Sequence, residues 1–118
     1  MSIKIKRIYE PYSPNDGYRL LIDRLWPRGM KKADAKIDKW LKEIAPSAGL
    51  RKWFNHESEK WDEFRRRYHA ELNDSAALNE ILALLKEHES ITFLFASKEE
   101  KHNHAVVLKQ FVTDYSAS

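Results

Sequence analysis

The sequence YRLLIDRLWPRG, residues 18–29, decides the fold of this chain. Its first half contains the continuous apolar run Leu20–Ile22, which is typical of a strand covered on both faces. A proline and a glycine near its end interrupt regular structure. We therefore predict a buried strand that places Asp23, Arg24 and Arg28 at or just beyond its carboxyl end.

Two further strands are predicted from the patterns at the two ends of the chain. Residues 3–8 alternate apolar and basic side chains, which indicates a strand with Lys4 and Lys6 on a solvated face. Residues 91–96 form a continuous β-prone run, typical of a strand covered on both faces. The loop at residues 10–17 is too short for an ordinary helical crossover. The first two strands are therefore either antiparallel neighbours or joined by an unusually tight connection.

The middle of the chain has the residue spacing of helices. The first helix is predicted after a cap at Asp34, on apolar residues at spacings of three, one and three, namely Ile37, Trp40, Leu41 and Ile44. Ser47 is expected to cap a short second helix. Helices follow over residues 61–72 and from Asp74 or Ser75. We interpret their apolar and aromatic stripes as core.

The end of the chain indicates half of a βα unit. Directly after the third strand, Ser97 and Glu100 have the spacing of a capping box. The helix predicted there has an apolar face made of Val107, Leu108, Phe111, Val112 and Tyr115. The sequence therefore predicts an α/β fold, with a short, mostly parallel sheet of about three strands flanked by four to five helices.

Length and composition limit the protein to one core. A chain of 118 residues, 42% hydrophobic and 33% charged, is too short for two cores, so we expect one small domain over residues 1–115 and a loose tail at 116–118. The net charge of +3 permits an anionic partner but does not require one. The chain has no cysteine, which excludes disulfides and thiolate chemistry. It has no long apolar run, so a cytoplasmic protein without membrane contact is expected.

Polar side chains from two segments are expected to meet at one edge of the sheet. The apolar stripe of the last helix extends backward onto Asn103 and His104, near a helix start that favours anions. In open α/β sheets, ligands bind outside the carboxyl ends of the strands. If the second and third strands are parallel and adjacent, the site combines Asp23, Arg24 and Arg28 with Lys98, His102, Asn103 and His104.

We expect this site to bind a phosphate-bearing or carboxylate-bearing small molecule. Arg24 and Arg28 are the expected charge-assisted donors, and His104 is the candidate acid or base. Asp23 is expected to orient an arginine or the histidine. Trp26 is either a packing residue or a stacking platform. The sequence indicates no particular cofactor.

The same residues have structural alternatives. Asp23 with Arg24 or Arg28 also fits a structural ion pair, and His104 also fits a hydrogen-bonded core histidine. His102 and His104 lie two positions apart, which places them on different faces of a helix, and no third ligand has a useful spacing. We therefore predict no metal site.

Other functional classes have weaker support. No serine occupies a nucleophile-elbow setting, and three glycines are too few for a glycine-rich phosphate loop. Nothing in the sequence fixes the separation that a hydrolytic pair of Asp23 and Glu10 needs. A nucleic-acid-binding or regulatory module that uses Arg65, Arg66 and Arg67 is one alternative. An interaction domain without catalytic activity is another.

Several short segments carry a family resemblance. They are RIY at 7–9, RLWPRG at 24–29, APS at 45–47, WF at 53–54, FRRRY at 64–68 and HNHAVVL at 102–108. Together they resemble the YeaO-like branch of the DUF488 family, a bacterial family of domains of unknown function. The resemblance covers nearly the whole chain. It implies a small α/β domain and no established reaction.

Longer members of the wider family are similar in two places. One is a Val-Asp-Val-Arg strand that ends with a proline and an arginine, and it corresponds to Asp23, Arg24, Pro27 and Arg28. The other is a Cys-His-Arg sequence just after a late strand, and it corresponds to residues 103–105. Only the histidine of that second motif matches, because asparagine and alanine replace its neighbours here. This departure removes the thiol and one arginine from the site that the resemblance implies.

Overall fold

The apolar run at residues 20–22 lies in the interior of a parallel sheet in the computed structural model, which describes residues 2–117. The sheet has four strands in the order β1-β4-β2-β3. Their bounds are Ser2–Arg7 for β1, Tyr18–Leu21 for β2, Lys39–Trp40 for β3 and Ser90–Phe95 for β4. The α/β class and the parallel sheet are confirmed, with four strands where about three were expected.

Strand β4 lies between β1 and β2 and is parallel to both. The first two strands are therefore parallel to each other and are not neighbours. Residues 8–17 connect them through the short 3₁₀ helix η1 (Pro14–Asp16) rather than through an α-helical crossover. Gly17, at a φ of 67°, ends this connection where a side chain would collide with the Ser90 carbonyl. The adjacent, parallel arrangement of β2 and β4 is confirmed.

The prediction of one helix from Asp34 to Ile44 is wrong. The chain forms a four-residue helix α1 (Lys32–Ala35), then strand β3, then the 3₁₀ helix η2 (Lys42–Ile44). Lys36 ends α1 in the left-handed conformation, with a φ of 49°. Trp40 packs on one side of the sheet and Leu41 on the other, as neighbours in a strand do. Edge pairing with β2 therefore prevails over the helical spacing.

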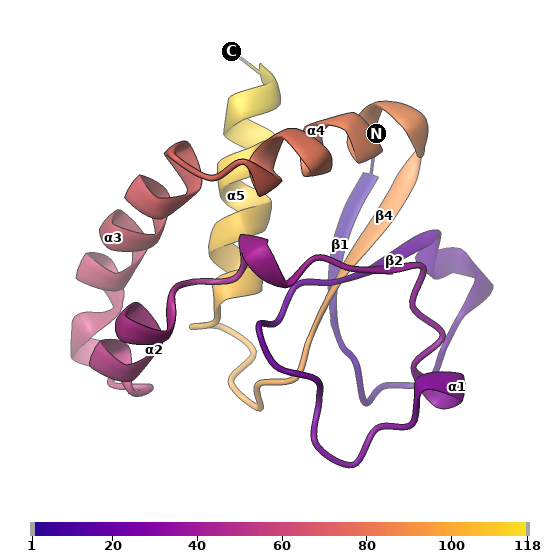
Figure 1. The fold of residues 1–118 in the computed structure, drawn as a ribbon, viewed down its shortest axis with the longest axis horizontal. Helices are drawn as coiled ribbons and strands as arrows, with labels where there is room; N and C mark the ends of the chain where they lie inside the picture. Colours follow the sequence, from indigo (N-terminus) through magenta and orange to yellow (C-terminus); the bar gives the residue numbers. More distant parts are fainter. Residues whose placement is uncertain (1, 118) are drawn as a thin grey trace.

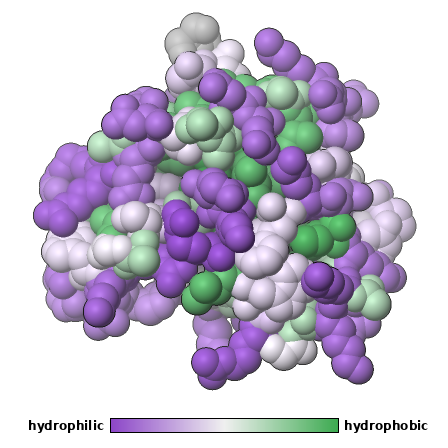
Figure 2. Space-filling model, viewed as in Figure 1, coloured by the Kyte–Doolittle hydropathy of each residue, from purple (hydrophilic) through white to green (hydrophobic). Residues whose placement is uncertain are grey.

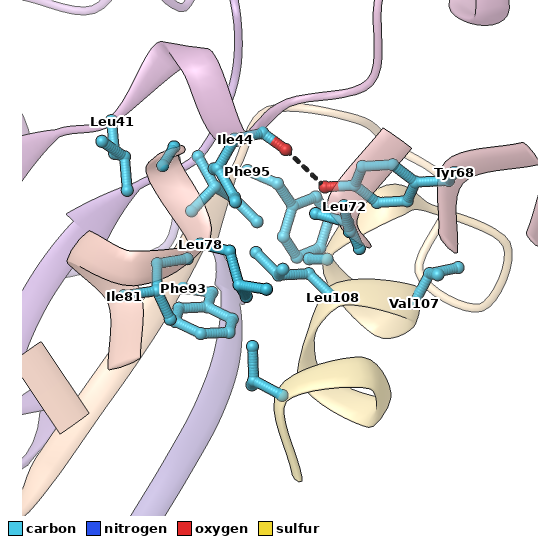
Figure 3. Close-up of a cluster of buried hydrophobic side chains, with 14 of the residues drawn as sticks. Leu41, Ile44, Tyr68, Leu72, Leu78, Ile81, Phe93, Phe95, Val107 and Leu108 are labelled. Atoms are coloured by element: carbon cyan, nitrogen blue, oxygen red, sulfur yellow. Dashed lines mark hydrogen bonds between the residues drawn. The ribbon is translucent and has the colours of Figure 1, made fainter. Parts of the chain in front are cut away.

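The longer helices cover one face of the sheet (Figure 1). They are α2 (Ala48–Phe54), α3 (Trp61–Asn73), α4 (Ala77–Glu87) and α5 (His104–Ala117), with the 3₁₀ helix η3 (Ser58–Lys60) before α3. Their apolar residues pack against Leu20 and Phe93, and Figure 3 shows Tyr68 donating a hydrogen bond to the Ile44 carbonyl within this core. Leu21 and Leu94 face a smaller cluster covered by α1 and loops.

The last helix begins later than the capping-box spacing predicts. Residues 97–103 form a loop, and Asn103 caps α5, because its side-chain oxygen accepts a hydrogen bond from the Val106 N–H at 3.1 Å. Tyr115, expected in the core, is 50% exposed. The helix continues through Ala117, and Ser118, the last residue of the predicted tail, lies outside the described residues. Within residues 2–117, no helix has the length and apolar character needed to cross a membrane.

Candidate functional site

A cavity of about 660 Å³ lies at the carboxyl ends of β2 and β4. Three segments line it, namely the loop after β2, the segment 45–56 with α2, and the loop after β4 with the start of α5. In Figure 1 the loop after β4 passes between α2 and the loop after β2. In Figure 2 the lower edge of the molecule is indented in this region. The edge of the sheet predicted to hold the site thus contains a cavity.

Asp23 and His104 are neighbours in the cavity wall. The His104 Nε2 lies 3.0 Å from the Asp23 Oδ1, and both side chains are 15% exposed. The other carboxylate oxygen of Asp23 accepts a hydrogen bond from the Ala96 N–H at 2.9 Å. The two strand ends are therefore joined through one carboxylate.

The hydrogen bond of His104 to the backbone shows which of its ring nitrogens carries a proton. Its Nε2 lies 3.1 Å from the Ile22 carbonyl oxygen, which can only accept. Nε2 therefore carries the proton, and Nδ1 is left as the acceptor of the neutral ring. The Asp23 Oδ1 is buried and has no aligned hydrogen bond among the described residues, so its contact with Nε2 is mainly electrostatic. His104 lines the cavity, and Nδ1 is the ring nitrogen that the neutral side chain leaves as a proton acceptor.

Arg24, in the loop after β2, is held by backbone carbonyls of the segment 45–56. Its guanidinium donates to the Ala45 oxygen at 3.0 Å and to the Pro46 oxygen at 3.3 Å. The next residue, Ser47, is fixed in turn by Glu71 of α3, whose carboxylate accepts from both the Ser47 N–H and its hydroxyl. Arg24 therefore shapes the cavity, and its positive charge stays within the cavity wall.

Arg28 and Trp26 also line the cavity. Arg28 is exposed, and its carbonyl accepts a hydrogen bond from the Tyr9 hydroxyl at 2.7 Å. Trp26 is half-buried, donates to the Met30 carbonyl at 2.7 Å and contacts Trp40 edge-on at 5.4 Å between centroids. Trp26 is thus a packing residue that also presents part of its surface to the cavity.

The loop after β4 contributes two of the other predicted residues. His102 lines the cavity and packs against Trp61, with 4.8 Å between ring centroids. Asn103 lines it too, but both ends of its amide serve the helix cap, since its nitrogen donates to the Glu99 carbonyl at 2.7 Å. Lys98 is exposed and does not line the cavity.

Helix α2 adds residues that the sequence did not indicate. Arg51 and Lys52, in its last turn, line the cavity, as do Asn55 and His56 beyond its end. Asn55 and His56 both have left-handed backbones, at φ values of 46° and 57°. No local sequence signal marks these residues, because their approach depends on how the chain turns back at Pro46.

The cavity lining is strongly cationic. Its permanent charges are one carboxylate, Asp23, and the four cations Arg24, Arg28, Arg51 and Lys52. Beneath it, burial raises the pKa of the Tyr68 hydroxyl well above its ordinary value, and the Glu71 and Asp23 carboxylates add to this effect. Tyr68 is therefore a neutral hydrogen-bond donor. Within residues 2–117, no three or more histidine, aspartate or glutamate side chains form a group that could hold a metal ion.

The arginine run on α3 is compensated by acids of the same helix. Arg66 and Arg67 both contact Glu63, and Arg65 lies 3.7 Å from Asp62. The side chains of the three arginines are 49–70% exposed, but each has an acidic neighbour one turn away. This pairing weakens the field that a phosphate backbone would experience.

A family model described as the inactive DUF488-N3 subclade matches residues 2–118. The chain belongs to this family. The uncharacterised protein YeaO of Escherichia coli is 44% identical over 112 residues, which cover 95% of this chain and 97% of YeaO. An uncharacterised protein of Mycobacterium tuberculosis is 43% identical over 110 residues, which cover 93% of this chain and 92% of that protein. No solved structure matches the chain.

Membership of the DUF488-N3 subclade confirms the resemblance drawn from the short segments. The description of the subclade names no substrate or reaction, and calls it inactive. Asn103, which the resemblance aligns with the cysteine of longer family members, is 4% exposed and caps α5. A structural amide thus stands at that position.

Proposed function

We propose that this DUF488-N3 domain binds an anionic small molecule that carries a phosphate or carboxylate group. The proposal rests on the charge of the cavity lining, which contains four cations and one carboxylate. Guanidinium groups suit phosphates and carboxylates because they donate charge-assisted hydrogen bonds in a fork. Arg28 and Arg51 are exposed and line the cavity, so they are the expected primary contacts.

The proposed role is binding rather than thiol chemistry. By the resemblance, Asn103 stands where longer family members have a cysteine, and its amide is used in the helix cap. His104 remains next to the ligand position as an acid or base through Nδ1, which leaves proton transfer as the chemistry this site can support. The cytoplasmic location expected from the sequence is part of the same proposal.

Thermal unfolding with a panel of anions tests the proposal. The panel contains inorganic phosphate, nucleotides, phosphorylated metabolites and small carboxylates. A ligand at a hundredfold its dissociation constant adds roughly 2.7 kcal/mol, which raises the midpoint by several degrees. Arg28→Ala and Arg51→Ala are each expected to weaken binding at least tenfold, or about 1.4 kcal/mol.

Lys109→Ala is the matched control, because Lys109 is exposed on α5 and does not line the cavity. It should leave both the midpoint and the ligand shift unchanged. Equal ligand shifts in the parent protein and in both arginine variants would contradict the proposed site. A panel without any stabilising anion would contradict anion binding itself.

A further inference from the structure

Large apolar side chains are exposed to water at the mouth of the cavity, which is unfavourable for apolar surface. Four such side chains are exposed in the described part of the chain, and two of them, Leu25 and Tyr9, line this cavity. Leu25 is 66% exposed, although it lies between Arg24 and the half-buried Trp26. Exposed apolar groups gathered at a concave site indicate contact with an apolar part of a ligand.

The inner wall of the cavity is aromatic. Phe54 and Phe64 both line it, and their rings stack with 4.4 Å between centroids and an interplanar angle of 27°. Trp26 lines the cavity from the loop after β2. Aromatic walls favour aromatic ligands, because offset and edge-on ring contacts add to the burial of apolar area.

His56 has an unfavourable backbone conformation at this wall. It follows Asn55, and both residues are left-handed, a conformation that a side chain normally disfavours. The His56 side chain makes no hydrogen bond within residues 2–117, and its ring lies 6.3 Å from that of Phe54. Strained residues of this kind concentrate at ligand sites. His56 thus adds a further aromatic ring beside Phe54, and both residues line the cavity.

We propose that the anion bound in this cavity carries an aromatic ring. The inference rests on the proposed function and adds the chemistry of the rest of the ligand. The ring contacts Leu25, Phe54 and His56, while the phosphate or carboxylate faces Arg28 and Arg51. A simple inorganic anion would leave Leu25 exposed to water at the cavity.

Calorimetric titration with methyl, cyclohexyl and phenyl phosphate tests the inference, because the three share one anionic group. Phenyl phosphate is expected to bind at least tenfold more tightly than methyl phosphate and clearly more tightly than cyclohexyl phosphate. Benzoate and acetate form the matching carboxylate pair and show which anionic group the site prefers. Leu25→Ser should weaken phenyl phosphate at least threefold and leave methyl phosphate unchanged, whereas Leu25→Met should preserve both affinities.

The outcomes separate the two proposals. Equal affinities for methyl and phenyl phosphate, or for cyclohexyl and phenyl phosphate, would overturn the aromatic inference and leave anion binding intact. If none of the phosphates or carboxylates binds, both proposals fail.

A His56→Gly variant checks the role of the strained residue. Glycine adopts positive φ without steric cost, so the unfolding midpoint is expected to rise by a few degrees while the affinity for phenyl phosphate falls. Lys36→Gly is the matched control, because Lys36 is also left-handed but lies outside the cavity. It should raise the midpoint without changing the affinity. An unchanged affinity in His56→Gly would remove His56 from the aromatic contact.

Discussion

Asp16→Ala is expected to lower the free energy of unfolding by about 3–5 kcal/mol, since it leaves a buried charge without its partner. The Asp16 carboxylate contacts Arg19, which is 1% exposed, and accepts from Lys6 at 3.0 Å. It also accepts from the Ser13 N–H at 3.1 Å. The remaining guanidinium donors of Arg19 bind the Ala35 and Lys36 carbonyls, so the arginine cannot move to water without losing them.

Urea unfolding of the variant measures this effect. Asp34→Ala is the control, because Asp34 is an exposed acidic residue of α1. It should change the free energy of unfolding by less than about 0.5 kcal/mol. Because Asp16 does not line the cavity, ligand affinity below the unfolding transition should stay unchanged. A loss below about 1 kcal/mol in Asp16→Ala would show that water reaches Arg19 in the folded protein.

The same carboxylate gives stability a pH dependence. Burial alone would raise the pKa of Asp16, but hydrogen bonds from Lys6, the Ser13 N–H and Arg19 outweigh it and lower the pKa. A lowered pKa means that the stabilisation is complete above the unfolded value of about 3.9 and is lost as the pH falls through the folded value. Unfolding measured from pH 7 downward should show this decline in the parent and a smaller one in Asp16→Ala. An identical decline would contradict the assignment.

The burial of Lys6 in this network was not predictable from the pattern of the first strand. Alternation in residues 3–8 placed Lys4 and Lys6 on one solvated face, and Lys4 is indeed exposed. The Lys6 side chain is only 17% exposed, because the connection through η1 folds back over it and brings Asp16 within 3.0 Å. Strand periodicity identifies a face, but what covers that face depends on a distant loop.

The strands and the later helices were predictable because each has a strong local signal. Continuous apolar runs mark β2 and β4, and Ser47 caps α2 as expected, accepting from the Leu50 N–H at 3.1 Å. The region of β3 was not predictable, because apolar spacings of three, one and three fit both a helix and a strand that divides its side chains between two cores. Tertiary pairing with β2 decides between them.

The candidate site was likewise only partly predictable from the sequence. The approach of Asp23 to His104 was predictable, because neighbouring parallel strands end at the same edge of a sheet. The contribution of Arg51 and His56 was not, because it depends on the turn at Pro46 and on two left-handed residues after α2. The sequence thus located the strand-end half of the cavity and missed the helical half.

Asp23 should oppose anion binding, because it is the only carboxylate among the described residues that line the cavity. Removing its charge should therefore raise the affinity for an anion. A carboxylate roughly 8 Å from a bound anion repels it by about 0.5–2 kcal/mol. Asp23→Ala is therefore expected to bind phosphate at least twofold more tightly at low ionic strength, and added salt should reduce the gain. If Asp23 instead orients a donor for the ligand, the affinity will fall.

The same substitution is expected to lower the free energy of unfolding by about 2–3 kcal/mol, because the Ala96 N–H loses its acceptor and the His104 Nε2 loses the carboxylate 3.0 Å away. Asp23→Asn is the matched variant, since its amide oxygen can still accept from Ala96. It should keep most of the stability and show the same gain in phosphate affinity. Titration of both variants below their unfolding midpoints separates the electrostatic effect from the structural one. A gain in neither variant would contradict the repulsion of the bound anion by Asp23.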